Sequence, residues 1–303
     1  MKERESQIVS RRKRRDTRDG WLFILPATVA FLLFIGIPMV MAFGLMFFDY
    51  NLIQSPTFIG WNNFRRLSMD PLVVRVLGNT FRYFVYITPI HCVLALILAY
   101  VVMQVKHSRL RNIYRGFIYF PTIVTTASVA IAWTFMFSTD LGLINYFVRQ
   151  FGGTNIPWMT DPNMIYVTIA IFSAWKFIGI TFLYYFIGLQ NIPASYHEAA
   201  MIDGASKRQT FFRITLPMLS PTIFFVFVTN MIGVFQIFEE PFFIAGLANA
   251  NARSLSLHIY EVAFNNVRIG YASLLAVIMF LIILTITIVQ FIGQRRWVNY
   301  DYE

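Results

Sequence analysis

Polar side chains recur on one face of the fifth of six apolar runs in this sequence. Thr229, Gly233, Gln236 and Glu240 stand at positions i, i+4, i+7 and i+11, and Asn230 lies beside the first of them. That spacing places them on one side of a helix. Polar groups are costly inside a membrane and tend to face a cavity or another helix. The pattern predicts either a surface that hydrogen-bonds a polar solute or polar contacts between helices.

No motif for catalysis accompanies these residues. The chain has no G-x-x-x-x-G-K-[ST] segment to hold ATP phosphates, and neither H-E-x-x-H nor G-x-S-x-G occurs. The single Cys92 allows no intrachain disulfide and argues against a cysteine metal site. His91 stands on an apolar helix, which favours a packed side chain over a ligand. We therefore expect no enzymatic activity, no metal site and no cofactor in this chain.

The elements that position these residues are membrane-spanning helices. Of 303 residues, 57% are hydrophobic and 13% are charged, against roughly a quarter charged in soluble domains. Runs of about 20 apolar residues cross a bilayer. Six occur here: residues 21–48, 81–105, 113–137, 164–189, 216–237 and 271–292. A membrane β-barrel would instead alternate over segments of about ten residues. The sequence predicts an all-α, polytopic membrane protein with six transmembrane helices.

The net charge of +10 is distributed asymmetrically along the chain. Clusters of basic residues precede the first run, separate the second from the third and the fourth from the fifth, and follow the sixth. By the positive-inside rule both termini lie in the cytoplasm. Residues 1–20 are expected to be an uncleaved cytoplasmic tail, because the run that follows is too long for a signal peptide. Nucleic-acid binding is disfavoured, since no basic groove interleaved with aromatic residues is visible.

A polar segment at residues 190–221 separates the fourth and fifth runs. Ser195 and Glu198 have the spacing of a capping box, and Gly204 stands where a helix can end in a left-handed residue. A second short helix is expected from Ser206 to about Arg213. The segment is thus predicted to be two exposed short helices with a bend at Gly204. Physical reasoning alone leaves open a docking surface for another protein or an amphipathic loop on the lipid headgroups.

The amino-acid sequence of this segment resembles a known signature. Glu198-Ala199-Ala200, Asp203-Gly204-Ala205, Ile214 and Leu216-Pro217 stand at the spacing E-A-A-x-x-x-G-A…I-x-L-P. This is similar to the EAA loop of bacterial ABC-importer permeases, where a cytoplasmic ATPase docks. Stretches at 114–121, 137–145 and 264–273 resemble the maltose/glycerol-phosphate type sugar branch of that family. One departure is at 246–249, where Gly-Leu-Ala-Asn replaces the usual glycine-rich stretch.

The resemblance implies a fold and a set of partners. It implies a type I ABC-importer permease fold over residues 21–297, with the EAA loop at about 190–217 and a short cytoplasmic tail at 298–303. Family members lie in the bacterial cytoplasmic membrane. They work with a second permease, two cytoplasmic ATPases that bind ATP and Mg, and an extracytoplasmic solute-binding protein. Glu198 would then reach an ATPase side chain, Gly204 would allow the bend, and the coupling residues would be Glu198, Ala199, Ala200, Asp203, Gly204 and Ala205.

A sugar path needs hydrogen-bonding groups and an aromatic platform, which the fourth run offers in Ser173, Trp175, Lys176 and Tyr184. Two interpretations of the polar set stay open. Its members line the path, or they join helices, with Lys176 paired to a carboxylate such as Glu240. The candidate substrate residues are Trp175, Lys176, Thr229, Asn230, Gln236 and Glu240.

Other functions remain compatible with an apolar six-span chain. A secondary transporter or channel driven by an ion gradient is the main alternative to an ATP-driven sugar importer. Such proteins usually show repeated halves or intramembrane carboxylates, and here only Glu239 and Glu240 stand near an interface. A membrane scaffold is a third possibility, and it would bind partners without moving a solute.

Overall fold

The computed structural model describes residue 17, residues 19–246 and residues 249–299. Four helices in this part of the chain are long and apolar enough to cross a membrane, and two bent helix pairs raise the number to six. The expected all-α architecture with six spans is confirmed when each bent pair counts as one span. The predicted basic tail lies almost entirely outside the described residues, as do residues 247–248 of the unusual outer stretch and residues 300–303 of the C-terminal tail.

Two of the expected spans are not continuous helices. The third breaks between α5 (Ser108–Ile123) and α6 (Thr126–Met136) with a bend of 94°. The backbone is extended at Val124 and Thr125, close after Pro121. The fifth breaks between α11 (Leu216–Met218) and α12 (Ser220–Phe235) with a bend of 64°. Hydropathy identified both runs as apolar spans but did not reveal either bend.

The bend before α12 has a local chemical cause. Pro221 has no N–H to donate to the carbonyl four residues earlier, on Pro217. The hydroxyl of Ser220 donates to that carbonyl instead, at 2.7 Å. A side chain thus replaces the missing backbone hydrogen bond, and the helix changes direction there.

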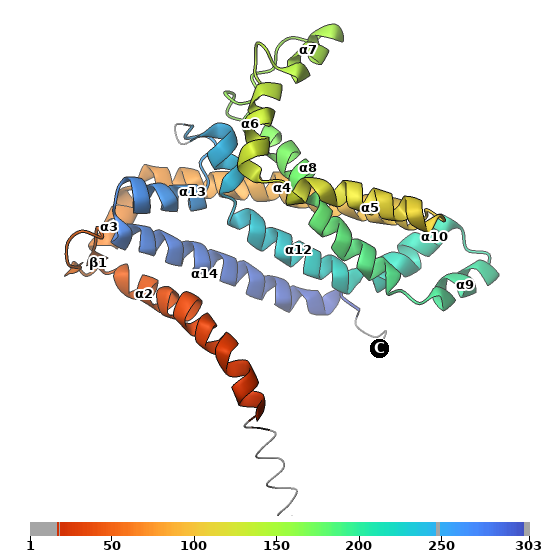
Figure 1. The fold of residues 1–303 in the computed structure, drawn as a ribbon, viewed down its shortest axis with the longest axis horizontal. Coiled ribbons are helices and arrows are strands. Elements are labelled where there is room, and N and C mark those ends of the chain that lie inside the picture. Colours follow the sequence, from red (N-terminus) through yellow and green to blue (C-terminus); the bar gives the residue numbers. More distant parts are fainter. Residues whose placement is uncertain (1–16, 18, 247–248, 300–303) are drawn as a thin grey trace, which may run out of the picture. The chain divides into compact units, whose positions relative to one another are not determined.

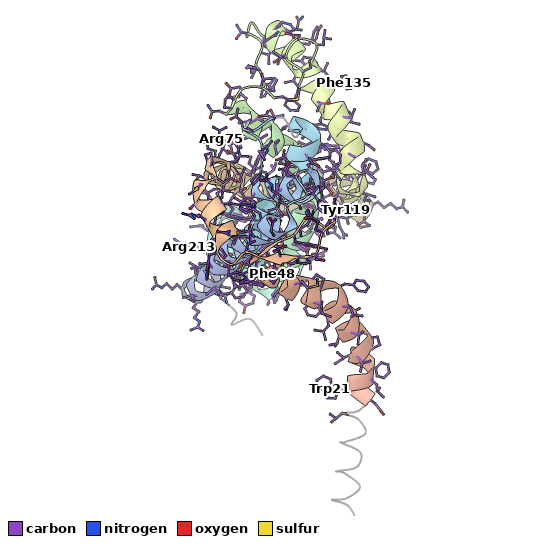
Figure 2. All side chains as sticks on the ribbon, turned by 90° about the vertical axis from the view of Figure 1, so that its left-hand side faces the viewer. Trp21, Phe48, Arg75, Tyr119, Phe135 and Arg213 are labelled. Carbon is purple, nitrogen blue, oxygen red and sulfur yellow. The ribbon has the colours of Figure 1, made fainter. Side chains whose placement is uncertain are left out.

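The chain forms two compact units. Unit 1 comprises the described residues up to Arg66 together with Val262–Val277. Its first helix runs from Asp19 to Leu45 and includes a π-helical turn at Leu32–Gly36 and α2 (Ile37–Leu45). Figure 2 shows side chains projecting from this helix on several sides, beginning at Trp21. Its large apolar side chains are exposed, as suits a helix in contact with lipid.

Unit 1 continues through a small hairpin. β1 (Phe48–Asp49) pairs antiparallel with β2 (Thr57–Phe58), and α3 (Asn62–Met69) follows. The buried amide of Asn63 donates to the carbonyls of Met46 and Phe48, at 2.9 and 3.1 Å. Gly270, at the start of α14 (Ile269–Gly293), passes so near the chain that a Cβ there would lie 1.9 Å from the Phe48 carbonyl oxygen. The glycine therefore permits the close approach of these two segments.

Unit 2 comprises Leu67–Glu261 with Ile278–Glu303 and holds the polar residues discussed above. α4 (Pro71–Met103) and α8 (Met164–Gln190) pack along each other at its centre, with α5 against α8 and α12 against both central helices. α5 comes close to α8 because residue 179 is glycine: a Cβ there would lie 2.8 Å from the Ile118 carbonyl oxygen.

Short elements occupy the ends of unit 2. Figure 1 shows α9 (Ala194–Ile202) and α10 (Lys207–Thr210) at one end of the long helices. α13 (Leu255–Tyr260) lies toward the other end, and α7 (Leu143–Gln150) stands beyond α6. The loop around α7 is held by Asn145, which is fully buried and donates to the carbonyls of Thr139 and Ile156, both at 2.9 Å.

Candidate functional site

The predicted bend in the 190–221 segment is present as a Schellman motif. The amide of Gly204 donates to the carbonyl of Met201 at 3.1 Å, and that of Ala205 donates to Ala200 at 2.9 Å. These are the two bonds that define the motif, and Gly204 has the required positive φ of 73°. The expectation that Gly204 ends a helix in the left-handed conformation is confirmed.

The expected capping box at Ser195 is wrong. α9 begins after Pro193 without a side-chain cap, so Ser195 lies inside the helix. The capping box belongs to the next helix instead. There, Ser206 Oγ accepts from the amide of Gln209 at 3.3 Å, and Gln209 Oε1 accepts from the amide of Ser206 at 2.8 Å. The second helix also runs further than expected, through a π-helical turn at Phe211–Thr215 and into α11.

We call α9, the turn at Gly204 and α10 the elbow. Most of the predicted coupling residues are exposed on it: Glu198, Ala199, Asp203 and Gly204. Ala200 faces inward and is 5% exposed, and Ala205 is half-buried. Two large apolar side chains are also exposed, Met201 at 68% and Ile202 at 86%. Apolar side chains exposed beside small ones form a surface that a second protein can cover closely.

The C-terminal tail lies against the bend between α11 and α12, which follows the elbow and which we call the joint. The amide of Asn299 donates to Ser220 Oγ at 3.0 Å, so the Ser220 hydroxyl joins the tail to the bend. Val298 is buried beside Phe224 and Val228 on α12. The last described residues of the chain thus touch the point where the elbow meets a transmembrane helix.

A cavity of about 600 Å³ lies among α4, α8, α12 and the start of the π-helical turn Pro241–Ala245. Four of the six predicted substrate residues line it: Thr229, Asn230, Gln236 and Glu240. Gly233 lies on the same wall, and Ser173 and Tyr184 come from α8. The structure therefore brings the polar face of the fifth run and part of the fourth around one space. That a solute passes through it stays a prediction.

Hydrogen bonds connect three helices behind this cavity. His91 Nδ1 on α4 lies 2.9 Å from Asn230 Oδ1 on α12. Asn230 Nδ2 donates to the carbonyl of Val226 at 2.9 Å and to Thr181 Oγ1 on α8 at 3.3 Å. Ser173 Oγ lies 3.4 Å from both His91 Nε2 and Glu240 Oε1. Asn230 thus joins helices and also lines the cavity.

Trp175 and Lys176 do not line the cavity. The Trp175 ring packs against Trp133 on α6. Lys176 is 2% exposed, and its ammonium donates to the carbonyls of Pro121, Thr122 and Val124 at the break between α5 and α6. Among the described residues the structure records no ion pair between Lys176 and Glu240. The predicted pairing is therefore wrong, because the free carbonyls of the broken helix take up the ammonium.

Sequence reasoning missed several residues of the cavity. Phe177 and Thr181 line it from α8 and stand at helical spacing with Ser173 and Tyr184, which the sequence had suggested, so this periodicity could have revealed them. Phe238 and Glu239 extend the wall beyond Gln236. His91 could not be found this way, because its place depends on how α4 packs against α12.

The cavity offers hydrogen bonds and aromatic surface but no arrangement for bond cleavage. Its wall holds one histidine, two carboxylates, hydroxyls and amides, with Tyr184 and two phenylalanines. Within the described part of the chain, no group of three or more histidine, cysteine or acidic residues could hold a metal ion. Such a wall suits transient binding of a polyhydroxylated solute rather than its chemical change.

A charged cluster lies outside the candidate spans, near α13. Arg253 Nη2 pairs with Glu261 Oε1 at 3.0 Å, and His258 Nδ1 lies 3.7 Å from Glu261 Oε2. Burial lowers the pKa of His258 below its usual value, and the carboxylates of Glu261 and Asp70 only partly offset this effect. The imidazole is therefore held neutral near neutral pH.

Comparison with known proteins places this architecture in a family. Residues 91–299 match the family described as "Binding-protein-dependent transport system inner membrane component". The chain is 36% identical to the probable ABC transporter permease protein YesP of Bacillus subtilis, over 96% of this chain and 95% of that protein. It is 33% identical to the lactose transport system permease protein LacF of Rhizobium radiobacter, over 92% and 94% of the two chains.

The fold also matches a solved structure. A chain from the crystal structure of a bacterial ABC transporter involved in the import of the acidic polysaccharide alginate superimposes with a TM-score of 0.80 and 23% identity, covering 95% of this chain and all of that one. Together with the EAA elbow, the bent spans and the polar intramembrane cavity, these matches identify the chain as a member of the binding-protein-dependent transport system inner membrane component family, the permeases of ABC importers.

Proposed function

We propose that this permease passes a sugar or oligosaccharide across the bacterial cytoplasmic membrane. The observation that carries the cargo class is the 600 Å³ cavity, whose wall combines hydroxyl, amide and carboxylate groups with Tyr184 and Phe177. Sugars bind through hydrogen bonds to their hydroxyls and through contact of their ring faces with aromatic side chains. The names of relatives support the same class, since they include permeases for lactose and arabinooligosaccharides.

The free energy for sugar transport comes from other subunits of the importer. We infer that two cytoplasmic ATPases bind ATP and Mg, and that this chain holds no cofactor of its own. The elbow is the surface that suits them, because it exposes Glu198, Asp203 and two large apolar side chains. Closure of the ATPase dimer would move the elbow, and the joint at Ser220 would pass this movement to α12, which carries one wall of the cavity.

The remaining partners follow from the family and from the charge distribution. A second permease, a related chain, would complete the path, and an extracytoplasmic solute-binding protein would deliver the sugar. The basic clusters near the elbow and the termini support a cytoplasmic location for these segments.

The test is transport by the reconstituted importer. This permease would be purified with its co-isolating subunits, placed in proteoliposomes with the binding protein, and supplied with labelled sugars and internal ATP. We expect uptake that requires ATP hydrolysis and persists when proton and sodium gradients are dissipated. Uptake that follows an ion gradient without ATP would contradict the proposal and restore the secondary-transporter alternative.

Two variants connect transport to the cavity. Gln236→Ala and Glu240→Ala each remove a hydrogen-bonding group from the wall. We expect slower uptake or a changed sugar preference while the complex still assembles and hydrolyses ATP. If uptake and preference are both unchanged in both variants, the cavity is not the path.

A further inference from the structure

We propose that the cavity wall contributed by this chain selects uncharged sugar units and rejects sugar acids and sugar phosphates. The inference rests on the proposed function and narrows its substrate class. It is argued from three features of the wall: its charge, the place of the nearby lysine and the hydrogen-bond donors that remain available.

The wall carries negative charge and no positive charge. Glu239 and Glu240 both line the cavity, Glu239 exposed and Glu240 buried. Among the described residues, neither arginine nor lysine is part of the lining. A carboxylate or phosphate on the solute would therefore meet the like charge of Glu239 in a medium less polarisable than water, where repulsion is stronger.

The lysine that could have neutralised such an anion faces another way. Lys176 stands one turn of α8 after Ser173, which does line the cavity. Its ammonium is committed to the carbonyls of Pro121, Thr122 and Val124 at the α5–α6 break. Withdrawing it would leave those carbonyls without a donor inside the membrane, which is costly. The cation is thus a fixed part of the fold rather than a ligand for the solute.

The hydrogen-bond donors of the wall are also largely committed. The Asn230 amide nitrogen donates to the Val226 carbonyl, so the orientation of this amide is fixed and its oxygen faces His91. That oxygen can only accept, so the proton lies on His91 Nδ1 and Nε2 is left as an acceptor. The Thr229 hydroxyl is likewise committed to the Phe225 and Val226 carbonyls.

The acceptors His91 Nε2 and Glu239 distinguish solutes by the protons they bring. A sugar hydroxyl can donate to Nε2 or to a carboxylate, whereas an ionised carboxylate or phosphate can only accept. The charge and the hydrogen bonding of the wall therefore favour the same class of cargo. Uncharged sugar units meet acceptors for their hydroxyl protons, and anionic units meet the repulsion of Glu239.

The experiment compares a neutral and an anionic trisaccharide of the same length and linkage. They are α-1,4-linked galactotriose and α-1,4-linked trigalacturonate, in which a carboxylate replaces the CH₂OH group of each sugar unit. Their binding to the purified permease–ATPase complex in detergent, without the binding protein, is measured by saturation-transfer difference NMR. We expect galactotriose to bind at least about fivefold more tightly, the factor for one unit charge a few ångströms away in a watery environment.

Variants assign the effect to this wall. The double variant Glu239→Gln with Glu240→Gln is expected to raise trigalacturonate binding relative to galactotriose binding by at least about fivefold. Glu239→Gln alone provides the test if the double variant assembles poorly, since Glu239 is exposed in the cavity. Asp140→Asn is the matched control, because it removes an exposed carboxylate outside the cavity and should change neither affinity.

Three results would overturn the inference. They are equal or tighter binding of trigalacturonate by the wild-type complex, no response of its binding to the glutamate variants, and no saturation transfer to either sugar. None of them affects the transport test above, in which ATP-dependent sugar uptake decides the proposed function separately.

Discussion

The ammonium of Lys176 lies 3.0 Å from the carbonyl oxygen of Pro121, across the interface between α8 and α5. The same cation reaches two more carbonyls at the end of α5, where a broken helix leaves acceptors without amide partners. Thr122 returns a bond, its hydroxyl donating to the Lys176 carbonyl at 3.0 Å. A buried charge thus holds a 94° bend in place within a transmembrane segment.

This relationship predicts a stability effect. Lys176→Met would leave buried carbonyls unsatisfied and should destabilise the protein by about 3 kcal/mol, the usual scale for removing one partner of a buried polar contact. Thermal unfolding in detergent, followed by tryptophan fluorescence, measures it. Lys207→Met, on the exposed surface of α10, is the control and should leave the melting temperature within error. An unchanged melting temperature in Lys176→Met would show that the ammonium does not support the bend.

Replacing Gly204 by alanine should destabilise the turn slightly, whereas replacing it by proline should abolish the turn. A Cβ at Gly204 meets no atom within 4 Å, so Gly204→Ala costs only the strain of a positive φ, about 1 kcal/mol. Proline cannot adopt that φ and also removes the amide that donates to Met201. We expect Gly204→Pro to reach the membrane but to lose ATP-driven uptake and the stimulation of ATPase activity by the loaded binding protein.

The control for this prediction is Gly204→Asn. Asparagine enters the left-handed region more readily than other side chains, so this variant should keep most of the uptake. Normal transport by Gly204→Pro would contradict the proposal that the elbow couples the ATPases to the permease.

The tail contact predicts a difference between two substitutions at one position. Asn299→Pro removes the amide that donates to Ser220, whereas Asn299→Ala keeps it. We expect the proline variant to release the tail and to be cut faster by trypsin after the exposed Arg295 and Arg296. Asn299→Ala should be cut at the wild-type rate, and equal rates in both variants would mean that this bond does not hold the tail.

Acid should weaken the region around His258. Burial lowers the pKa of His258 in the folded protein from its usual 6.5, so the unfolded chain binds a proton between these two values and the folded protein does not. Stability is therefore lost as the pH falls from about 6.5 toward the folded pKa, and is constant well above 6.5. Melting temperatures from pH 8 to 5 test this.

Two variants separate His258 from other groups that titrate in the same range. His258→Gln should show a shallower loss of melting temperature on acidification. His107→Gln, at an exposed position, should keep the wild-type profile. Identical profiles for all three proteins would assign the acid sensitivity elsewhere.

The sequence predicted the membrane-spanning segments because a bilayer imposes long apolar runs, and these are visible without a structure. The Gly204 turn was equally predictable, since few residues other than glycine suit a positive φ at a helix end. The bends could not be seen in hydropathy, because residues 113–137 stay apolar through the break at Val124. The capping box predicted at Ser195 and Glu198 was wrong because the same residue spacing can occur where no helix begins.

The cavity was partly predictable for a related reason. Thr229, Gln236 and Glu240 share a helix face, and this periodicity placed them on one wall. Lys176 was misplaced because its nearest acceptors belong to α5, more than fifty residues earlier in the chain. His91 was missed because its neighbour Asn230 is distant in sequence. Contacts of this kind depend on how helices pack, and a one-dimensional pattern does not contain them.

The contact between Asn299 and Ser220 also makes Asn299 a natural position for an optical sensor. The chain has one cysteine, Cys92, so its replacement gives a background in which a single new thiol can be labelled. A polarity-sensitive dye on Asn299→Cys would sit beside the joint between the elbow and α12. Its emission would then report each opening of that joint during the ATP cycle, in the intact importer and without a fused reporter protein.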